Sequence, residues 1–255
     1  MNEIVKISNL SVAYGNEPPV LQNVELTVFQ NDFLGIIGPN GGGKTTLLKT
    51  LLGLLPASTG TIEFYQQGKR VNRLNIGYLP QINRIDKKFP ISVLDVILSG
   101  LTVEKKIFSN FTAQQKEQAI RTAEKMGLGG LLKRPVGDLS GGQLQRTLLG
   151  RAIVDEPDLL ALDEPDSYVD KQFETDFYDI LTELNTHTAI ILVSHDVGTI
   201  LSQVKNVACV NGGLHYHPAE GITPEWIDKR YASCPIEFVA HGDFPHRVLG
   251  KHEAG

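Results

Sequence analysis

The 255-residue sequence has only two cysteines, Cys209 and Cys234. Two are too few for a disulfide framework, and we expect both thiols to stay reduced inside a cell. The longest apolar stretch, Thr45–Leu55, is interrupted by Lys49 and is too short to cross a bilayer. The first ten residues include an acidic side chain and no long apolar run, unlike a secretory signal peptide. We therefore expect an intracellular protein whose role at any membrane depends on a partner.

The sequence also lacks an excess of positive charge, since its formal net charge at pH 7 is −5. A nucleic-acid-binding surface needs a basic stripe to meet the backbone phosphates, so we expect no nucleic-acid partner. The apolar fraction of 41% and the charged fraction of 21% are ordinary for a globular protein. A chain of this length can bury most of its apolar surface, in one large domain or two small ones.

The pattern of apolar residues predicts an α/β protein. The first thirty residues alternate apolar and polar side chains, which predicts short strands joined by the turn Gly15–Pro19. A helix is predicted from Lys44 to Leu55, where Pro56 follows. Three compact apolar runs are typical of buried parallel strands: Phe33–Ile37, Leu159–Leu162 and Ala189–Val193.

Residues from about 90 to 150 have a different character. Val93, Val96, Ile97 and Leu101 repeat at helical spacing, and the stretch 112–126 is rich in Ala, Gln, Lys and Glu before Gly127. We interpret this region as a small helical subdomain inserted into the α/β core.

The segment after the first compact run fits the phosphate-loop pattern G-x-x-x-x-G-K-[ST]. Its glycines let backbone N–H groups turn inward around a β-phosphate, where a side chain would block the approach. Lys44 supplies a charge for the β- and γ-phosphate oxygens, and Thr45 offers its hydroxyl to Mg²⁺. A strand before the loop and a helix after it favour this interpretation over a merely flexible loop. The residues predicted to hold the nucleotide are Gly38, Pro39, Asn40, Gly41, Gly42, Gly43, Lys44, Thr45 and Thr46.

A pair of carboxylates, Asp163 and Glu164, ends one of the apolar runs. Asp163 suits a ligand of Mg²⁺, usually through water, and Glu164 suits the group that orients and polarises an attacking water. An apolar strand that ends in Asp-Glu is common by itself. Downstream of a phosphate loop, the catalytic interpretation becomes the better one.

The sequence Leu139–Gln143, Leu-Ser-Gly-Gly-Gln, resembles the signature sequence of the ABC ATPases. The resemblance implies a second anion site, in which Ser140, Gly141, Gly142 and Gln143 face the γ-phosphate of an ATP held by another subunit. A simple Ser-Gly-Gly helix cap would account for part of this sequence but not for the whole set of motifs.

Further elements of the same family occur in the expected order. Gln81 in Gly-Tyr-Leu-Pro-Gln resembles the Q-loop glutamine, which implies a place near Mg²⁺ and the attacking water. His195 resembles the switch histidine, which implies contact with the γ-phosphate and support of Glu164. Tyr14 matches the aromatic residue that stacks on adenine. Asp170 closes a D-loop-like segment and is expected to reach across the dimer, although Tyr168 departs from the usual small-residue pattern.

The resemblance covers about residues 1–215 and implies the fold of a P-loop NTPase. It implies a RecA-like parallel-sheet core with an antiparallel β subdomain and an inserted α-helical subdomain. We expect one ABC ATPase domain over residues 1–255, with the core in 1–88 and 150–215, the helical subdomain in 89–149 and a tail in 216–255. The implied cofactors are ATP and Mg²⁺, with two ATP molecules between the subunits of a head-to-tail homodimer.

The spacing of about sixty residues between Gln81 and Ser140 leaves room for a short helical subdomain but not for a long coiled coil. Together with the stretch Phe89–Gly100, this resembles the ATPases of bacterial metal-ion and iron-chelate importers. The resemblance implies a polytopic membrane permease as partner, an extracytoplasmic metal-binding protein acting indirectly, and a place at the cytoplasmic face of the bacterial inner membrane. We expect uptake of a divalent metal, with zinc ahead of manganese. Two alternatives remain: a haem or siderophore importer, and a soluble ABC ATPase in iron–sulfur assembly.

The last forty residues are polar and contain several histidines, and they resemble the endings of zinc and manganese importer ATPases. His215 and His217 would share one face if they lie on a strand, a geometry that can bind Zn²⁺. Solvated surface histidines are the better interpretation, because the spacing contains no recognisable four-ligand set.

Overall fold

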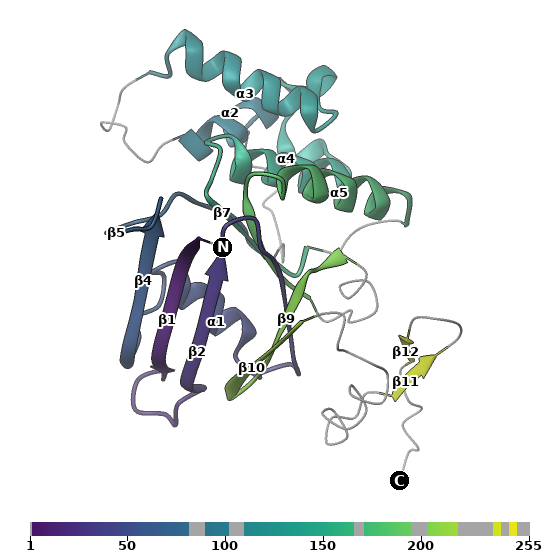
Figure 1. Ribbon diagram of the computed structural model, residues 1–255. Helices are drawn as coiled ribbons and strands as arrows, with labels where there is room; N and C mark the ends of the chain where they lie inside the picture. The colour runs from purple at the N-terminus through teal and green to yellow at the C-terminus, as the bar shows by residue number, and fades with distance from the viewer. Residues whose placement is uncertain are drawn as a thin grey trace. The chain divides into compact units, whose positions relative to one another are not determined.

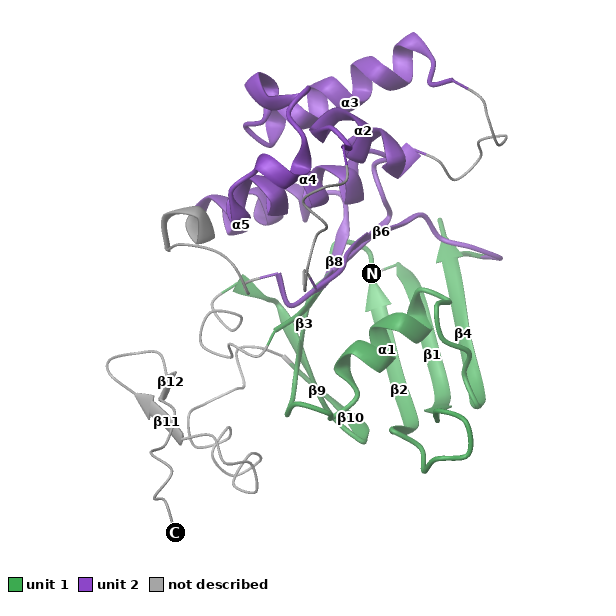
Figure 2. Ribbon diagram, turned by 180° about the vertical axis from the view of Figure 1, so that it is seen from behind, with its two compact units in different colours: residues 1–70, 191–255 green, residues 71–190 purple. Residues whose placement is uncertain are grey.

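The computed structural model describes residues 2–81, 90–101, 110–165, 171–194, 203–218, 237–240 and 245–248. The chain forms two compact units, which Figure 2 colours separately. The first unit comprises residues 1–70 and 191–255, and the second comprises residues 71–190. Among the described residues, no helix is long and apolar enough to span a membrane.

The first unit contains the antiparallel β subdomain that the sequence predicts. Four strands lie in the order β2-β1-β4-β5, and β1 pairs antiparallel with both β2 and β4. Ile7 of β1 faces Leu26 on one side and Ile62 on the other. The bounds are β1 Glu3–Val12, β2 Leu21–Phe29, β4 Thr59–Gln66 and β5 Lys69–Val71, the last of which reaches the boundary between the units.

Part of the parallel sheet also belongs to the first unit. The entirely buried strand β3 (Phe33–Ile37) pairs parallel with β9 (Asn206–Asn211), which pairs antiparallel with β10 (Gly213–Pro218). A short hairpin of β11 (Glu237–Ala240) and β12 (Pro245–Val248) lies further along the chain (Figure 1). The run of apolar residues in β3 is what a strand needs when both of its faces are covered.

Helix α1 (Lys44–Leu51) follows β3, and it is shorter than the sequence predicts. Leu52 caps it, Gly53 takes a left-handed conformation with φ +70°, and the amide of Leu54 donates to the Lys49 carbonyl at 2.9 Å. The prediction that the helix continues to Leu55 is therefore wrong by about one turn. The glycine, which accepts the left-handed conformation without a Cβ clash, ends the helix before the proline does.

Two further parallel strands, β6 (Ile76–Leu79) and β7 (Leu159–Asp163), belong to the second unit and pair with Leu79 beside Leu162. Strand β8 (Ala189–Val193) contains residues of both units and is buried throughout. The α/β architecture with parallel and antiparallel sheets confirms the predicted fold class.

The predicted helical subdomain is present in the second unit. Helix α4 contacts α2, α3 and β6. The approach to β6 is close, because a Cβ on Gly77 would lie 2.1 Å from the Ala152 carbonyl oxygen. The helical elements are α2 Val93–Leu98, α3 Ala113–Lys125, α4 Gly141–Ile153 and α5 Lys171–Leu184, with short 3₁₀ turns η1 Ser99–Leu101, η2 Gly129–Leu131 and η3 Val136–Asp138.

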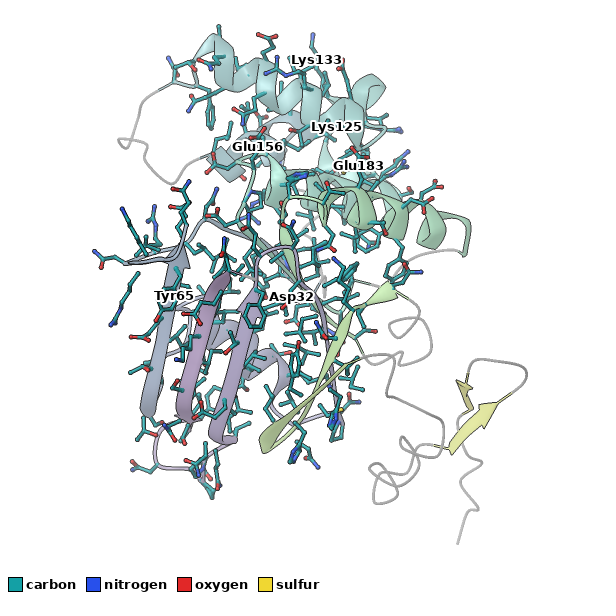
Figure 3. All side chains as sticks on the ribbon, viewed as in Figure 1. Asp32, Tyr65, Lys125, Lys133, Glu156 and Glu183 are labelled. Atoms are coloured by element: carbon teal, nitrogen blue, oxygen red, sulfur yellow. The ribbon has the colours of Figure 1, made fainter. Side chains whose placement is uncertain are left out.

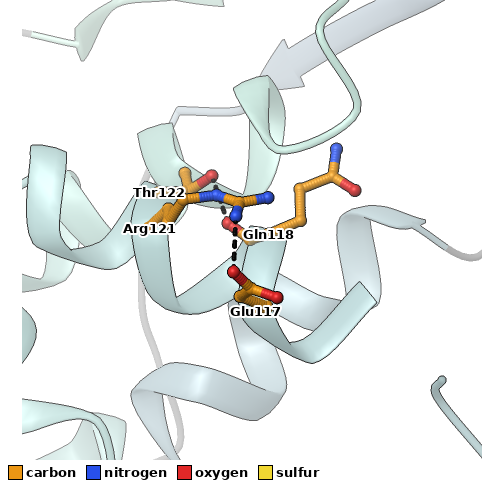
Figure 4. Close-up of polar contacts among 4 residues, drawn as sticks. All are labelled: Glu117, Gln118, Arg121 and Thr122. Carbon is orange, nitrogen blue, oxygen red and sulfur yellow. Dashed lines mark hydrogen bonds and ion pairs between the residues drawn. The ribbon is translucent and has the colours of Figure 1, made fainter. Parts of the chain in front are cut away.

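Helix α3 shows how this unit separates its polar and packed faces. Arg121 forms an ion pair with Glu117 one turn earlier at 2.7 Å, on the exposed face (Figure 4). Gln118 instead points its amide at α4 and donates to the Val154 carbonyl at 2.7 Å. Other charged side chains of this unit are likewise exposed, including Lys125, Lys133, Glu156 and Glu183, and Figure 3 labels them with Asp32 and Tyr65 of the first unit.

Candidate nucleotide site

The phosphate-loop residues form a tight turn between β3 and α1. Gly38, Gly41 and Gly43 have φ values of +152°, +78° and +104°, which side chains rarely adopt. A Cβ on Gly38 would lie 2.0 Å from the carbonyl oxygen of Val210, and one on Gly42 would lie 2.8 Å from the same atom. The loop is thus packed directly against the end of β9.

Hydrogen bonds fix the loop from the same side. The Gly212 amide donates to the Gly42 carbonyl at 3.1 Å, and the Gln22 amide donates to the Gly212 carbonyl at 2.7 Å. The turn between β9 and β10 therefore joins the phosphate loop to the start of β2. This support was not foreseen from the sequence, because the turn is about 170 residues away along the chain.

Lys44 is buried, with 5% of its surface exposed, and its ammonium group stays beside the loop. Its Nζ donates to the Gly38 carbonyl at 2.9 Å and to the Pro39 carbonyl at 3.0 Å. The same residue begins α1, so the cation and the positive end of the helix lie at one place. A doubly or triply charged phosphate group is the natural ligand for this arrangement.

Tyr14 contacts the same helix. Its hydroxyl lies 3.0 Å from the Oγ1 of Thr46, and 46% of the tyrosine surface is exposed. Thr46 itself is buried. The hydrogen bond anchors one end of the tyrosine and leaves part of the ring open to a planar ligand such as adenine, the role expected of this residue.

Asp163 ends β7 in the second unit, with only 2% of its surface exposed. The hydroxyl of Tyr78, which lies on the neighbouring strand β6, donates a hydrogen bond to its carboxylate. Burial, the charge of Asp163 and this hydrogen bond raise the pKa of Tyr78 to about 12. The tyrosine therefore remains a neutral donor at physiological pH and holds the carboxylate in place.

Glu164 directly follows this strand in an unusual backbone conformation, with φ +47°. Few non-glycine residues adopt it, and its cost is about 1–3 kcal/mol. The amide of Gln81 donates to a Glu164 carboxylate oxygen at 2.5 Å. The structure thus brings together two of the predicted catalytic residues, although they are 83 positions apart.

The signature residues form the beginning of α4. Ser140 is the N-cap, and its hydroxyl accepts from the Gln143 amide at 3.3 Å while the Gln143 side chain accepts from the Ser140 amide at 3.1 Å. This capping box occupies an acceptor site of the serine hydroxyl but not its proton. With Gly141 and Gly142 in the first turn, the helix start presents backbone amides and a hydroxyl donor, as an anion site requires.

Two predicted residues, His195 and Asp170, lie outside the described residues. Ser194, immediately before the histidine, is buried, and its amide donates to the Ile36 carbonyl at 3.2 Å. Of the tail histidines, His215 and His217 do lie on one face of a strand, β10. In the described parts of the chain, no group of three or more His, Cys, Asp or Glu side chains could hold a metal ion.

The oxygen atoms of the residues predicted to bind Mg²⁺ are of the kind that this ion prefers. Mg²⁺ prefers hard oxygen ligands and usually keeps several waters. Asp163 offers a buried carboxylate that its tyrosine neighbour keeps oriented, and Thr45 offers a half-buried hydroxyl at the start of α1.

Comparison with known proteins shows the family to which the chain belongs. The sequence profile of the family described as "ABC transporter" matches residues 21–167. The chain belongs to the ABC transporter family. It is 37% identical, over 83% of its length and 84% of the relative's, to the zinc uptake system ATP-binding protein ZurA of Listeria innocua. It is 39% identical to the manganese transport system ATP-binding protein MntB of Bacillus subtilis, over 76% of its length and 78% of the relative's.

A solved structure supports the same assignment. An inward-facing conformation of a putative metal-chelate type ABC transporter contains a chain that matches with a TM-score of 0.82 and 26% identity, covering 98% of both chains. Family membership makes this protein an ATP-binding, ATP-hydrolysing chain, as the order of motifs predicts.

Proposed function

We propose that this chain is the nucleotide-binding subunit that energises uptake of a divalent metal ion, zinc or manganese, through a separate membrane permease. The observation that carries the proposal is the identity of 37–39% with ATP-binding proteins of a zinc uptake system and a manganese transport system, over three quarters or more of the chain.

Binding of the nucleotide is assigned to the first unit. Tyr14 stacks on adenine, the loop Gly38–Gly43 surrounds the β-phosphate with backbone amides, and Lys44 turns its ammonium group from the loop carbonyls toward the phosphate oxygens. Exchange of carbonyl partners for charged phosphate oxygens favours the bound state, because charge-assisted hydrogen bonds are stronger than those to neutral carbonyls.

Hydrolysis is assigned to the second unit. Asp163 would hold Mg²⁺, which would supply neutralisation of charge on the phosphate oxygens. Glu164 orients the attacking water and accepts its proton, and the hydrogen bond from Gln81 fixes the carboxylate before the substrate arrives. His195 and Asp170 complete the site, the first at the γ-phosphate and the second across the dimer.

A head-to-tail homodimer is part of the proposal. It is supported by Ser140, which caps α4 and keeps its hydroxyl proton available for a phosphate group. We assign Ser140 and Gln143 to the γ-phosphate of the ATP that the partner subunit holds, so that two ATP molecules lie at the dimer interface. Dimer closure completes each site and release of products opens it, a gating step that can drive a transporter.

The permease is assigned to the region that contains α2. The amide of Val93 donates to the Arg134 carbonyl at 3.1 Å, and the Val136 amide donates to the Ile91 carbonyl at 2.9 Å. These bonds join the start of α2 to the segment that leads into the signature helix. A push on α2 by the permease therefore reaches Ser140 through backbone hydrogen bonds. The chain would act peripherally, at the cytoplasmic face of a bacterial membrane.

Reconstitution with the permease tests the proposal. The chain and its membrane partner are placed in proteoliposomes with a metal-binding protein, and ATP hydrolysis and metal uptake are measured for zinc, manganese and iron. We expect zinc or manganese to stimulate both, and Glu164→Gln to abolish both without preventing assembly. The proposal is wrong if no permease binds the chain, or if no divalent metal changes the rate.

An importer of metal chelates is the second candidate. It is favoured by the overall likeness to a chain of the putative metal-chelate type transporter. The same proteoliposomes distinguish the two, since a chelate importer would respond to iron bound to a haem or siderophore and not to free divalent ions.

A further inference from the structure

Gln145 lies inside the second unit and makes a connection that none of the predicted roles includes. It belongs to α4, five residues after Ser140, and only 1% of its surface is exposed. Its Nε2 donates a hydrogen bond to the carbonyl oxygen of Pro165 at 2.5 Å. Its Oε1 is buried and has no hydrogen-bond partner among the described residues.

The partner of this bond directly follows Glu164. The glutamate is consequently held at two points: Gln81 binds its carboxylate, and Gln145 binds the carbonyl of the next residue. Its left-handed backbone conformation, φ +47°, needs such support, because an unsupported chain would relax to a commoner conformation.

A buried glutamine with one unused oxygen is costly as packing alone. A buried acceptor without a partner destabilises the folded state, and an apolar side chain of the same size would avoid that penalty. The amide therefore has a use that an apolar side chain could not provide. That use is the bond from the signature helix to the backbone beside Glu164.

We propose that Gln145 is a positioning residue that couples the two nucleotide sites of the dimer. This inference rests on the proposed function, in which Ser140 meets the ATP of the partner subunit and Glu164 acts on the ATP of its own chain. When the partner's ATP engages Ser140, α4 becomes fixed, and Gln145 transmits that constraint to Pro165. The backbone of Glu164 is then held most firmly in the conformation that the structure shows when the partner's ATP is bound.

The test compares Gln145→Met with Gln118→Met in the full-length chain. Both glutamines donate a side-chain amide to a backbone carbonyl, but Gln118 donates to Val154, ten residues before Glu164, whereas Gln145 donates to the residue next to Glu164. Methionine has nearly the size of glutamine, so that each variant removes one hydrogen bond and little volume. The readouts are ATP affinity, ATP-driven dimerisation in a Glu164→Gln background, kcat, KM and the Hill coefficient of hydrolysis.

For Gln145→Met we expect kcat to fall about 10- to 100-fold, the loss typical of a misplaced catalytic group. ATP affinity and KM should change less than twofold, because the phosphate loop is untouched, and dimerisation should persist, because Ser140 is intact. The Hill coefficient should fall from above 1 toward 1, since the two nucleotide sites are no longer energetically coupled. Gln118→Met should retain the parental kcat and Hill coefficient.

The inference is overturned by a folded Gln145→Met protein with parental kcat and Hill coefficient, by an equal loss in Gln118→Met, or by a parental Hill coefficient of 1. Gln145→Leu provides the same comparison if the methionine variant does not fold. Failure of the proposed function gives a different result, since the parental chain would then not hydrolyse ATP and Glu164→Gln would not dimerise with ATP.

Discussion

Replacement of Gly38 by alanine tests how strictly the phosphate loop depends on its packing against β9. The new Cβ would lie 2.0 Å from the Val210 carbonyl oxygen, whereas ordinary contacts begin near 3.4 Å. The loop or the strand must therefore shift by about 1.4 Å, the difference between 3.4 and 2.0 Å, and overpacking of this kind costs roughly 1–3 kcal/mol. The alanine must also adopt φ +152°, a region that L-residues avoid.

The clash should lower the affinity for ATP. A loop that moves away from Val210 loses the shape that binds phosphate. ATP binding must bring the loop back to that shape, and the clash with Val210 then costs binding free energy. A penalty of about 1–3 kcal/mol corresponds to binding that is about 5- to 150-fold weaker. We expect this loss for Gly38→Ala, measured by fluorescence titration of the full-length chain with an ATP analogue.

Gly53→Ala is the matched control. Gly53 also has a positive φ, +70°, but a Cβ there meets nothing within 4 Å. Its left-handed strain of about 1–2 kcal/mol should lower Tm by about 2–8 °C and leave ATP affinity within twofold of the parental value. A Gly38→Ala protein that binds ATP with the parental affinity would refute the argument, as would equal losses of affinity in both variants.

Substitutions at three further residues of the site give further predictions. Glu164→Gln keeps the shape of the side chain but removes the proton acceptor. Steady-state hydrolysis should therefore fall by about 10²-fold or more, while a closed dimer accumulates in ATP. A variant with a near-parental turnover rate would show that another group is the base. Tyr78→Phe removes the donor to Asp163. Because the pKa of Tyr78 is about 12 in the folded state and 10 in the unfolded state, the free energy of unfolding of the parental chain should exceed that of the variant by a constant amount below pH 10, and this difference should shrink between pH 10 and 12. Urea unfolding measures the difference, and a difference that widens above pH 10 would contradict the assignment. Tyr14→Phe loses only the bond to Thr46 and should weaken ATP binding about two- to fivefold, whereas Tyr14→Ala also loses the ring and should weaken it about tenfold or more; equal effects would argue against stacking.

The phosphate loop and the signature could be predicted because their function depends on neighbouring residues. The turn at Gly38–Gly43 needs glycines at fixed places, and the capping box of Ser140 and Gln143 needs a spacing of three. Local chemistry also explains the incorrect end of α1. The sequence predicts that Pro56 ends the helix, but Gly53 offers a left-handed cap three residues earlier.

The contacts that hold these motifs in place could not be predicted. The bond between Tyr78 and Asp163 exists because β6 and β7 are adjacent and pair with Leu79 beside Leu162, a register that periodicity does not provide. The packing of Gly38 on Val210 likewise depends on the pairing of β3 with β9. Side-chain type gives a weak signal: a tyrosine in an otherwise apolar strand needs a hydrogen-bond partner.

The distribution of contacts separates affinity from turnover. The groups assigned to hold the nucleotide, from Tyr14 to Lys44, make their described hydrogen bonds within the first unit, and the groups around Glu164 make theirs within the second. Glu164 is restrained by a strand, by Gln81 and by the signature helix through Gln145. Substitutions among the groups that hold the nucleotide should therefore raise the Kd for ATP. Substitutions among the groups around Glu164 should lower kcat at unchanged Kd. Within the described residues, the signature helix has both a donor assigned to the partner's ATP and a bond beside Glu164, the carboxylate assigned to catalysis. Damage to that helix should therefore alter how the two sites depend on each other.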